Sequence, residues 1–83
     1  MISEFLLRGL SAPKSFTCQT MDAKQDIFWA KTNMTDERYK ALFNWAKNTD
    51  DFWKSKWIAV IEHDGLYEDG TPKNPIVLSI KES

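Results

Sequence analysis

Residues 56–80, KWIAVIEHDGLYEDGTPKNPIVLSI, decide the fold that this sequence predicts. Two apolar runs rich in β-forming residues, 57–61 and 75–80, have the length of strands. Between them lie four turn-forming pairs: Asp64-Gly65, Asp69-Gly70, Thr71-Pro72 and Asn74-Pro75. Because glycine accepts positive φ and proline fixes φ, we expect an ordered turn here, with Pro75 as the first residue of the second strand.

The first half of the chain predicts further strands. Residues 15–21 (SFTCQTM) and 27–31 (IFWAK) are rich in aromatic and β-branched residues, and the polar residues 22–26 between them have the length of a hairpin loop. The segment from Ile2 to Arg8 is apolar enough for a strand or a short helix, and its periodicity does not decide between them. Residues 9–14 (GLSAPK) are predicted to be a loop.

Residues 35–48 predict a helix. Thr35 is a suitable N-cap, and Asp36 and Glu37 follow in the first turn, where the helix dipole favours negative charge. Apolar side chains repeat at i, i+3, i+4 and i+7: Tyr39, Leu42, Phe43 and Ala46. This spacing predicts an amphipathic helix that ends near Asn48.

The predicted element order is strand, strand, strand, helix, strand, strand, when the segment 2–8 is counted as a strand. This is the order of an OB-fold, a five-stranded barrel with a helix between its third and fourth strands. Residues 50–54 are predicted to be a connector and residues 81–83 a tail. We therefore expect a mainly β, α+β fold with one OB-fold-like domain over residues 1–83, because a chain of 83 residues has room for one small core.

Composition narrows the classes of function. The net charge is −1 and the pI about 5.7, which differs from the basic footprint of most nucleic-acid-binding domains. The single cysteine, Cys18, cannot form an internal disulfide, and no signal-peptide pattern precedes it, so we expect a reducing cytoplasm. The longest apolar runs are too short to cross a membrane.

The chain resembles the C-terminal OB-fold domain of ATP-dependent DNA ligases of bacterial or phage type. Three segments carry the resemblance: the strand end IEHDG (61–65), the turn EDGTPKNP (68–75), and WAKTNMTDER (29–38), which is similar to the third ligase strand leading into its helix. The similarity runs in the family's order over residues 15–83. It implies a DNA-binding domain that clamps nicked DNA and supports strand joining in replication or repair.

Catalytic residues do not form a known pattern. A ligase nucleophile needs Lys-x-Asp-Gly, which does not occur in the sequence. The family's terminal motif, Arg-x-Asp-Lys, corresponds to Lys81-Glu82-Ser83, where lysine supplies charge without the bidentate guanidinium. Two reactive types stand alone, His63 and Cys18, and we interpret them as a structural or surface histidine and a buried strand residue. We expect no enzyme activity for the chain by itself, no cofactor and no metal site; three turn carboxylates are interpreted as solvated: Asp64, Glu68 and Asp69.

Candidate DNA contacts lie on the second and third predicted strands and on the loops beside them, where OB-folds hold nucleic acid. Trp29 and Lys31 share one face of the third strand, which pairs a stacking ring with a phosphate contact. The alternatives are solvated lysines and, favoured for Trp29, burial in the barrel core. The full set of predicted contacts to nicked or single-stranded DNA is Lys14, Gln19, Trp29, Lys31, Lys73 and Lys81.

A second hypothesis is a small interaction or inhibitor protein, for example one derived from a phage, that has an OB scaffold and no DNA surface. The strand 57–61 is apolar on both faces, so either the chain itself or a partner covers the second face. The candidate partner contacts are Phe52, Trp53 and Trp57.

Overall fold

Five strands and two helices make up the structure. The computed structural model of the chain describes residues 1–11, 14–21, 24–48 and 50–82. The elements follow in the order β1 (Ile2–Ser11), β2 (Ser15–Gln19), β3 (Ile27–Thr32), α1 (Asp36–Asn48), α2 (Asp51–Lys54), β4 (Trp57–Glu62) and β5 (Ile76–Glu82). The prediction of a mainly β fold with one long helix is confirmed.

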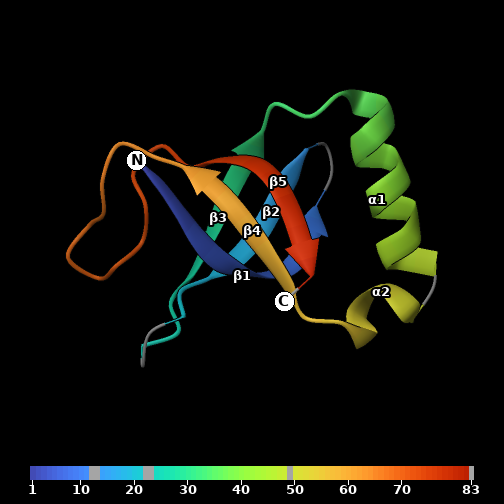
Figure 1. Cartoon of the computed structure of the whole chain (residues 1–83), viewed down its shortest axis with the longest axis horizontal. Helices are drawn as coiled ribbons and strands as arrows, with labels where there is room; N and C mark the ends of the chain where they lie inside the picture. Colours follow the sequence, from blue (N-terminus) through green and yellow to red (C-terminus); the bar gives the residue numbers. More distant parts are fainter. Residues whose placement is uncertain (12–13, 22–23, 49, 83) are drawn as a thin grey trace.

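The five strands close into a ring in the spatial order β1-β2-β3-β5-β4. Neighbouring strands are antiparallel except β3 and β5, which run parallel and pair at Lys31 with Ile76 and at Thr32 with Val77. Figure 1 shows α1 and α2 at one end of this ring and the segment between β4 and β5 projecting from the other. The two ends of the ring therefore carry different surfaces.

Several predicted boundaries are wrong. The open choice for the N-terminal segment resolves to a strand, which continues through Ser11, so residues 9–11 are not the loop that their composition predicts. A β-bulge between Leu7 and Gly9 lets the strand continue, because it places one extra residue on β1 opposite β2. At the other terminus Lys81 and Glu82 belong to β5 and not to a tail. Residues 12–13 of the predicted loop lie outside the described residues.

The long helix begins and ends where the sequence predicts. The Thr35 hydroxyl accepts a hydrogen bond from the backbone N–H of Arg38 at 3.3 Å, which confirms the N-cap. The helix directs its apolar stripe at the barrel end, where Tyr39 is buried and Leu42, Phe43 and Ala46 pack against the core. The Tyr39 hydroxyl lies 2.6 Å from the carbonyl of Ser11 and 2.9 Å from that of Ser15, so α1 is tied to the ends of both β1 and β2.

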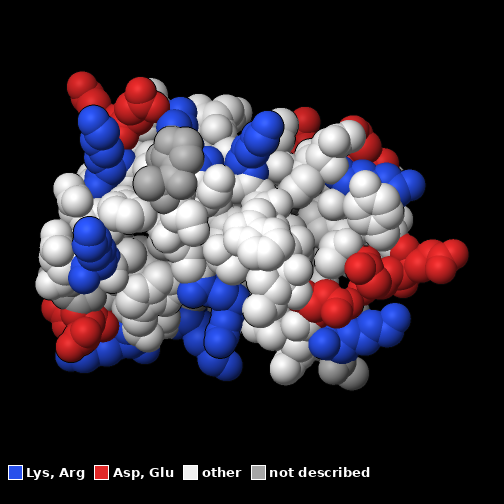
Figure 2. Space-filling model, turned by 180° about the vertical axis from the view of Figure 1, so that it is seen from behind, with Lys and Arg blue, Asp and Glu red and all other residues white. Residues whose placement is uncertain are grey.

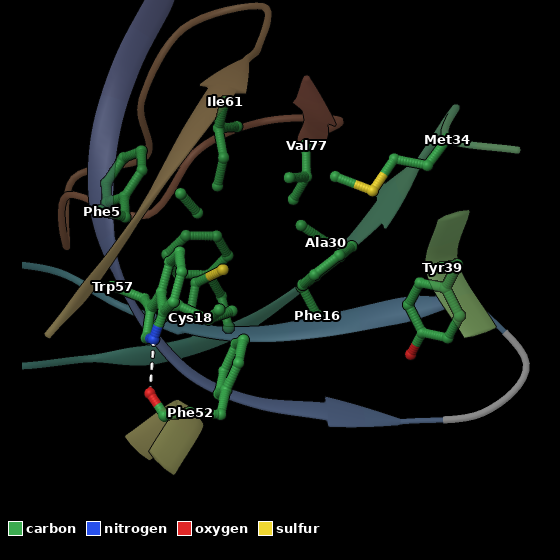
Figure 3. Packing of buried hydrophobic residues seen from close by; sticks show 13 residues of the cluster. Phe5, Phe16, Cys18, Ala30, Met34, Tyr39, Phe52, Trp57, Ile61 and Val77 are labelled. Carbon is green, nitrogen blue, oxygen red and sulfur yellow. Dashed lines mark hydrogen bonds between the residues drawn. The ribbon is translucent and has the colours of Figure 1, made fainter. Parts of the chain in front are cut away.

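The predicted connector at 50–54 is instead the short helix α2, and the predicted element order omitted it. Phe52 from α2 is fully buried, and its ring stacks on Trp57 with centroids 4.7 Å apart and planes at 9°. The Trp57 indole N–H donates to the carbonyl of Phe52 at 2.5 Å (Figure 3). The single turn of α2 therefore covers the core at the end of the ring that carries the helices.

One cluster of buried apolar side chains fills the ring. Its fully buried members include Phe16 and Cys18 from β2, Ile61 from β4 and Val77 from β5 (Figure 3). Phe5 meets Phe28 edge to face at 5.0 Å across the barrel. No helix within the described ranges is long and apolar enough to cross a membrane.

The segment between β4 and β5 is ordered, as its turn residues predict. Gly65 and Gly70 have φ of 124° and 89°, and Asn74 has φ of 50°, conformations that glycine and asparagine adopt most readily. His63 holds the base of this loop: its Nε2 lies 2.8 Å from the Ser3 hydroxyl, and its Nδ1 accepts from the backbone N–H of Gly65 at 3.1 Å. The buried His63 is thus structural, as interpreted from the sequence.

Candidate nucleic-acid interface

The outer face of β3 carries the candidate site. Phe28 and Ala30 point into the core, so the alternating residues Ile27, Trp29 and Lys31 point outward. Trp29 is 68% exposed. The favoured interpretation of Trp29 as a core residue is therefore wrong, and the ring is free to stack on a ligand.

A groove of about 360 Å³ separates the outer face of β3 from the loop between β4 and β5. Trp29 and Lys31 form one wall, and Tyr67, Pro72 and Pro75 form much of the other. The parallel pairing of Lys31 with Ile76 brings the two walls together. The groove therefore combines two exposed aromatic rings with a cationic side chain.

The loop wall is held in place by its own hydrogen bonds. The Asn74 amide donates to the Asp64 carboxylate at 3.0 Å, and Asp69 accepts from both the hydroxyl and the N–H of Thr71, at 2.6 and 2.9 Å. These two bonds from Thr71 lower the pKa of Asp69, so its carboxylate stays charged. The loop is consequently preorganised before any ligand arrives.

A second cation contacts one of the aromatic rings that line the groove. The Lys73 Nζ lies 5.4 Å from the centre of the Tyr67 ring, which is 56% exposed. This cation–π contact holds the ammonium beside Tyr67, outside the set of residues that line the groove. Tyr67 was not among the predicted contacts. Its position among the turn residues between the two predicted strands 57–61 and 75–80 is the signal in the sequence that points to it.

The floor continues from β3 onto β2 without a charged side chain. Thr17 pairs with Trp29 and Gln19 with Ile27, and both β2 residues are half-buried on the outer face. Figure 2, which views the molecule from the β2 and β3 side, shows a largely uncharged centre with Lys and Arg at separate points around it and Asp and Glu toward both ends. The surface therefore favours stacking over a uniformly positive track.

The structure brings two of the six predicted contacts into the groove. Trp29 and Lys31 line the groove, and Lys73 contacts the Tyr67 ring without being a lining residue. Gln19 lies on the adjoining strand β2, where its amide donates to the Gln25 carbonyl at 3.1 Å. Lys14 and Lys81 lie elsewhere, because Lys14 pairs with Asp36 at 3.2 Å and Lys81 with Glu4 at 2.5 Å. Neither lysine is part of the groove wall.

The candidate partner residues separate in the same way. Phe52 is fully buried and Trp57 is 9% exposed, so both belong to the core, whereas Trp53 is 41% exposed. On the second face of β4, Ile58 is 8% exposed, so the chain itself covers this position.

Cys18 is closed to solvent chemistry. It is fully buried in the core, and desolvation raises the pKa of its thiol to about 12, far from that of a nucleophile. Within the ranges that the structure describes, no three His, Cys, Asp or Glu side chains are grouped as metal ligands. The described groove offers aromatic faces, amides and ammonium groups.

Comparisons with known proteins do not place the chain in a family. No family model matches it, and no solved structure matches it. It is 36% identical over 62 residues to the short-chain dehydrogenase iccH of Talaromyces variabilis, an alignment that covers 75% of this chain. The chain spans 16% of the length of that dehydrogenase.

The expected membership in the DNA ligases is wrong. The curated similarity is to a dehydrogenase, and neither a ligase nor an OB-fold family is found. The ligase resemblance rested on short turn and strand-end segments, and such segments recur wherever a strand is followed by a glycine-rich turn. The clamping of nicks and the role in strand joining depended on that resemblance and are not retained.

Proposed function

We propose that this chain is a non-catalytic OB-type module that binds single-stranded nucleic acid in the groove between Trp29 and Tyr67. The carrying observation is the 68% exposure of Trp29 beside Lys31 and opposite a second exposed aromatic ring. Exposed rings accept bases of any sequence by stacking, and flanking lysines accept the phosphates between them. The ligand expected is therefore an unpaired strand, with little sequence preference.

The topology supports the OB-type assignment. The ring order, the parallel contact of β3 with β5 and the position of α1 between β3 and β4 agree with a five-stranded barrel that binds ligands across its second and third strands. In that arrangement the groove occupies the ligand position. Stacking and charge in the groove suit a binding role.

The test is a titration of labelled oligothymidylate and oligouridylate against the wild type and three variants, followed by fluorescence anisotropy. Base stacking contributes about 1–3 kcal/mol per base, so Trp29→Ala should weaken binding at least about fivefold and Trp29→Phe much less. Lys31→Gln should weaken binding moderately through one lost phosphate contact.

Lys40→Gln is the matched control, because it makes the same charge change on α1, away from the groove. If Lys40→Gln weakened binding as much as Lys31→Gln does, binding would depend on the net charge of the chain and not on the groove. Absence of binding by the wild type at low salt would refute nucleic-acid binding.

A protein partner is the second candidate, and exposed apolar side chains on β3, on β5 and in the loop between β4 and β5 favour it. Ile27 is 55% exposed, Leu66 50% and Ile76 40%, and such a gathering of exposed apolar side chains is typical of an interaction surface. Self-association or capture of a defined protein, abolished by Trp29→Ala while oligonucleotides fail to bind, would select this function.

A further inference from the structure

The β-bulge in β1 creates a second aromatic and cationic surface on the same side of the ring. Leu7 pairs with Cys18 and Gly9 with Thr17, so Arg8 is the extra residue of the bulge, and its side chain is exposed. Bulges commonly re-aim a side chain beside a functional site. Here the re-aimed side chain is a guanidinium, the group best suited to a phosphate.

Arg8 separates two hollows that both border Trp53. One, of about 310 Å³, lies between β1 and α1 and includes Phe43 and Lys47. The other, of about 400 Å³, lies between β1, the start of β4 and the end of β2, and includes Lys56 and Gln19. Arg8, Lys47, Trp53 and Lys56 are called the Trp53 surface below.

The charge of the Trp53 surface has one sign. Every charged side chain that lines either hollow is basic, although the whole chain has a net charge of −1. Among the described residues, Arg8, Lys47 and Lys56 form no ion pair. The Trp53 indole N–H donates to the carbonyl of Ala46 at 3.1 Å, which fixes a ring that is 41% exposed. An immobilised aromatic ring among cations that form no ion pair is complementary to an anion that carries aromatic groups.

The Trp53 surface adjoins the Trp29 groove across two strand spacings. Trp29 pairs with Thr17, and Thr17 pairs with Gly9, the neighbour of Arg8. Strands lie about 4.8 Å apart, so the path from Trp29 to Gly9 is about 10 Å. Thr17 and Gly9 present small groups along it, so no large side chain stands between the two surfaces.

We propose that a nucleic-acid strand which stacks on Trp29 continues across Thr17 and the bulge to the Trp53 surface, where Arg8, Lys47 and Lys56 bind its phosphates and Trp53 stacks on a base. This extension rests on the proposed function of the Trp29 groove. It assigns the chain a binding path that runs across the strands, with an aromatic residue near each end.

The test compares wild-type binding of short and long oligothymidylates, of about four and about twelve nucleotides, because OB-folds occupy sites in this range. The long probe should bind at least about tenfold more tightly than the short one. In Arg8→Gln/Lys56→Gln most of that gain should be lost while short-probe affinity is kept, with Lys47 and Trp53 retaining the remainder. The slope of log affinity against log salt for the long probe should fall by about 1.4, or 0.7 per lost phosphate contact.

Arg38→Gln/Lys40→Gln is the matched control, because it removes the same two charges, one arginine and one lysine, from α1 outside the Trp53 surface. In NMR spectra the Trp53 indole signal, assigned with Trp53→Phe, should shift with the long probe and not with the short one.

The outcomes separate this inference from the proposed function. If the short probe binds at Trp29 and Arg8→Gln/Lys56→Gln retains the full length gain, the path is refuted and the groove stands. If wild type binds neither probe, both fail. If oligoglutamate shifts the Trp53 signal and oligothymidylate does not, the Trp53 surface binds acidic protein segments and the proposed path is wrong.

Discussion

Cys18 makes the free energy of unfolding depend on pH in the alkaline range. Its thiol has a pKa of about 12 in the folded chain and 9.0 when exposed, because burial disfavours the thiolate. A raised folded pKa means that the neutral thiol stabilises the fold fully below pH 9, and that this contribution is lost as pH rises toward 12. One such proton gives a slope of at most about 1.4 kcal/mol per pH unit.

We therefore expect Cys18→Ala to flatten the fall in unfolding free energy between about pH 9 and 11, measured by urea titration. Burial also raises the pKa of Tyr39, so Tyr39→Phe provides a second variant that removes a different part of the alkaline slope. Equal slopes in wild type and Cys18→Ala would contradict the buried-thiol account.

The exposure of Trp29 could not be predicted from residue types alone. The residues facing inward on β3 are Phe28 and Ala30, and those facing outward are Ile27, Trp29 and Lys31. Both sets contain large apolar side chains, so alternation alone identifies two faces without saying which one is the core. The pairing of Trp29 with Lys31 was visible in the sequence, but the exposure of Trp29 depends on the closure of the ring.

At the scale of elements, α1 was predictable and α2 was not. Thirteen residues of α1 repeat their apolar positions with helical spacing and carry a capping threonine. Four residues of α2 make a single turn, which is too short to display a period. The bulge at Arg8 could not be predicted for a similar reason, because one extra residue in a strand is recognised only from its pairing with the neighbouring strand.

The short helix nevertheless carries a large share of the core. Phe52 packs against Trp45 and Trp53 edge to face and stacks on Trp57. Phe52→Ala should lower the unfolding free energy by about 3–5 kcal/mol, a large part of what a small domain possesses. Trp29→Ala removes a larger but exposed ring and should cost less than about 1 kcal/mol. Chemical denaturation followed by circular dichroism compares them, and comparable losses would show that α2 does not close the core.

At the scale of the whole molecule, the ring has one weak contact between neighbouring strands, the short pairing of β3 with β5, which is called the seam below. Among the described residues, β3 and β5 pair only at Lys31–Ile76 and Thr32–Val77, whereas β4 and β5 pair from Trp57–Glu82 to Glu62–Ile76. The Thr32 hydroxyl reinforces the seam by donating to the Val77 carbonyl at 2.9 Å and accepting from the Met34 N–H at 3.2 Å. Because Lys31 and Ile76 also line the groove, opening the seam would separate the groove walls.

Thr32→Val removes both hydrogen bonds at nearly constant volume and should cost about 1–2 kcal/mol, whereas Thr32→Ser keeps the hydroxyl and should cost less. Amide hydrogen exchange should be faster at the seam than in the β4–β5 ladder, and faster still in Thr32→Val. In the proposed binding mode an oligonucleotide contacts both walls, so it should slow exchange at the seam more than in β4–β5. Uniform protection across the ring would mean that the ligand does not bridge the walls, and the site would then have to lie on β3 alone.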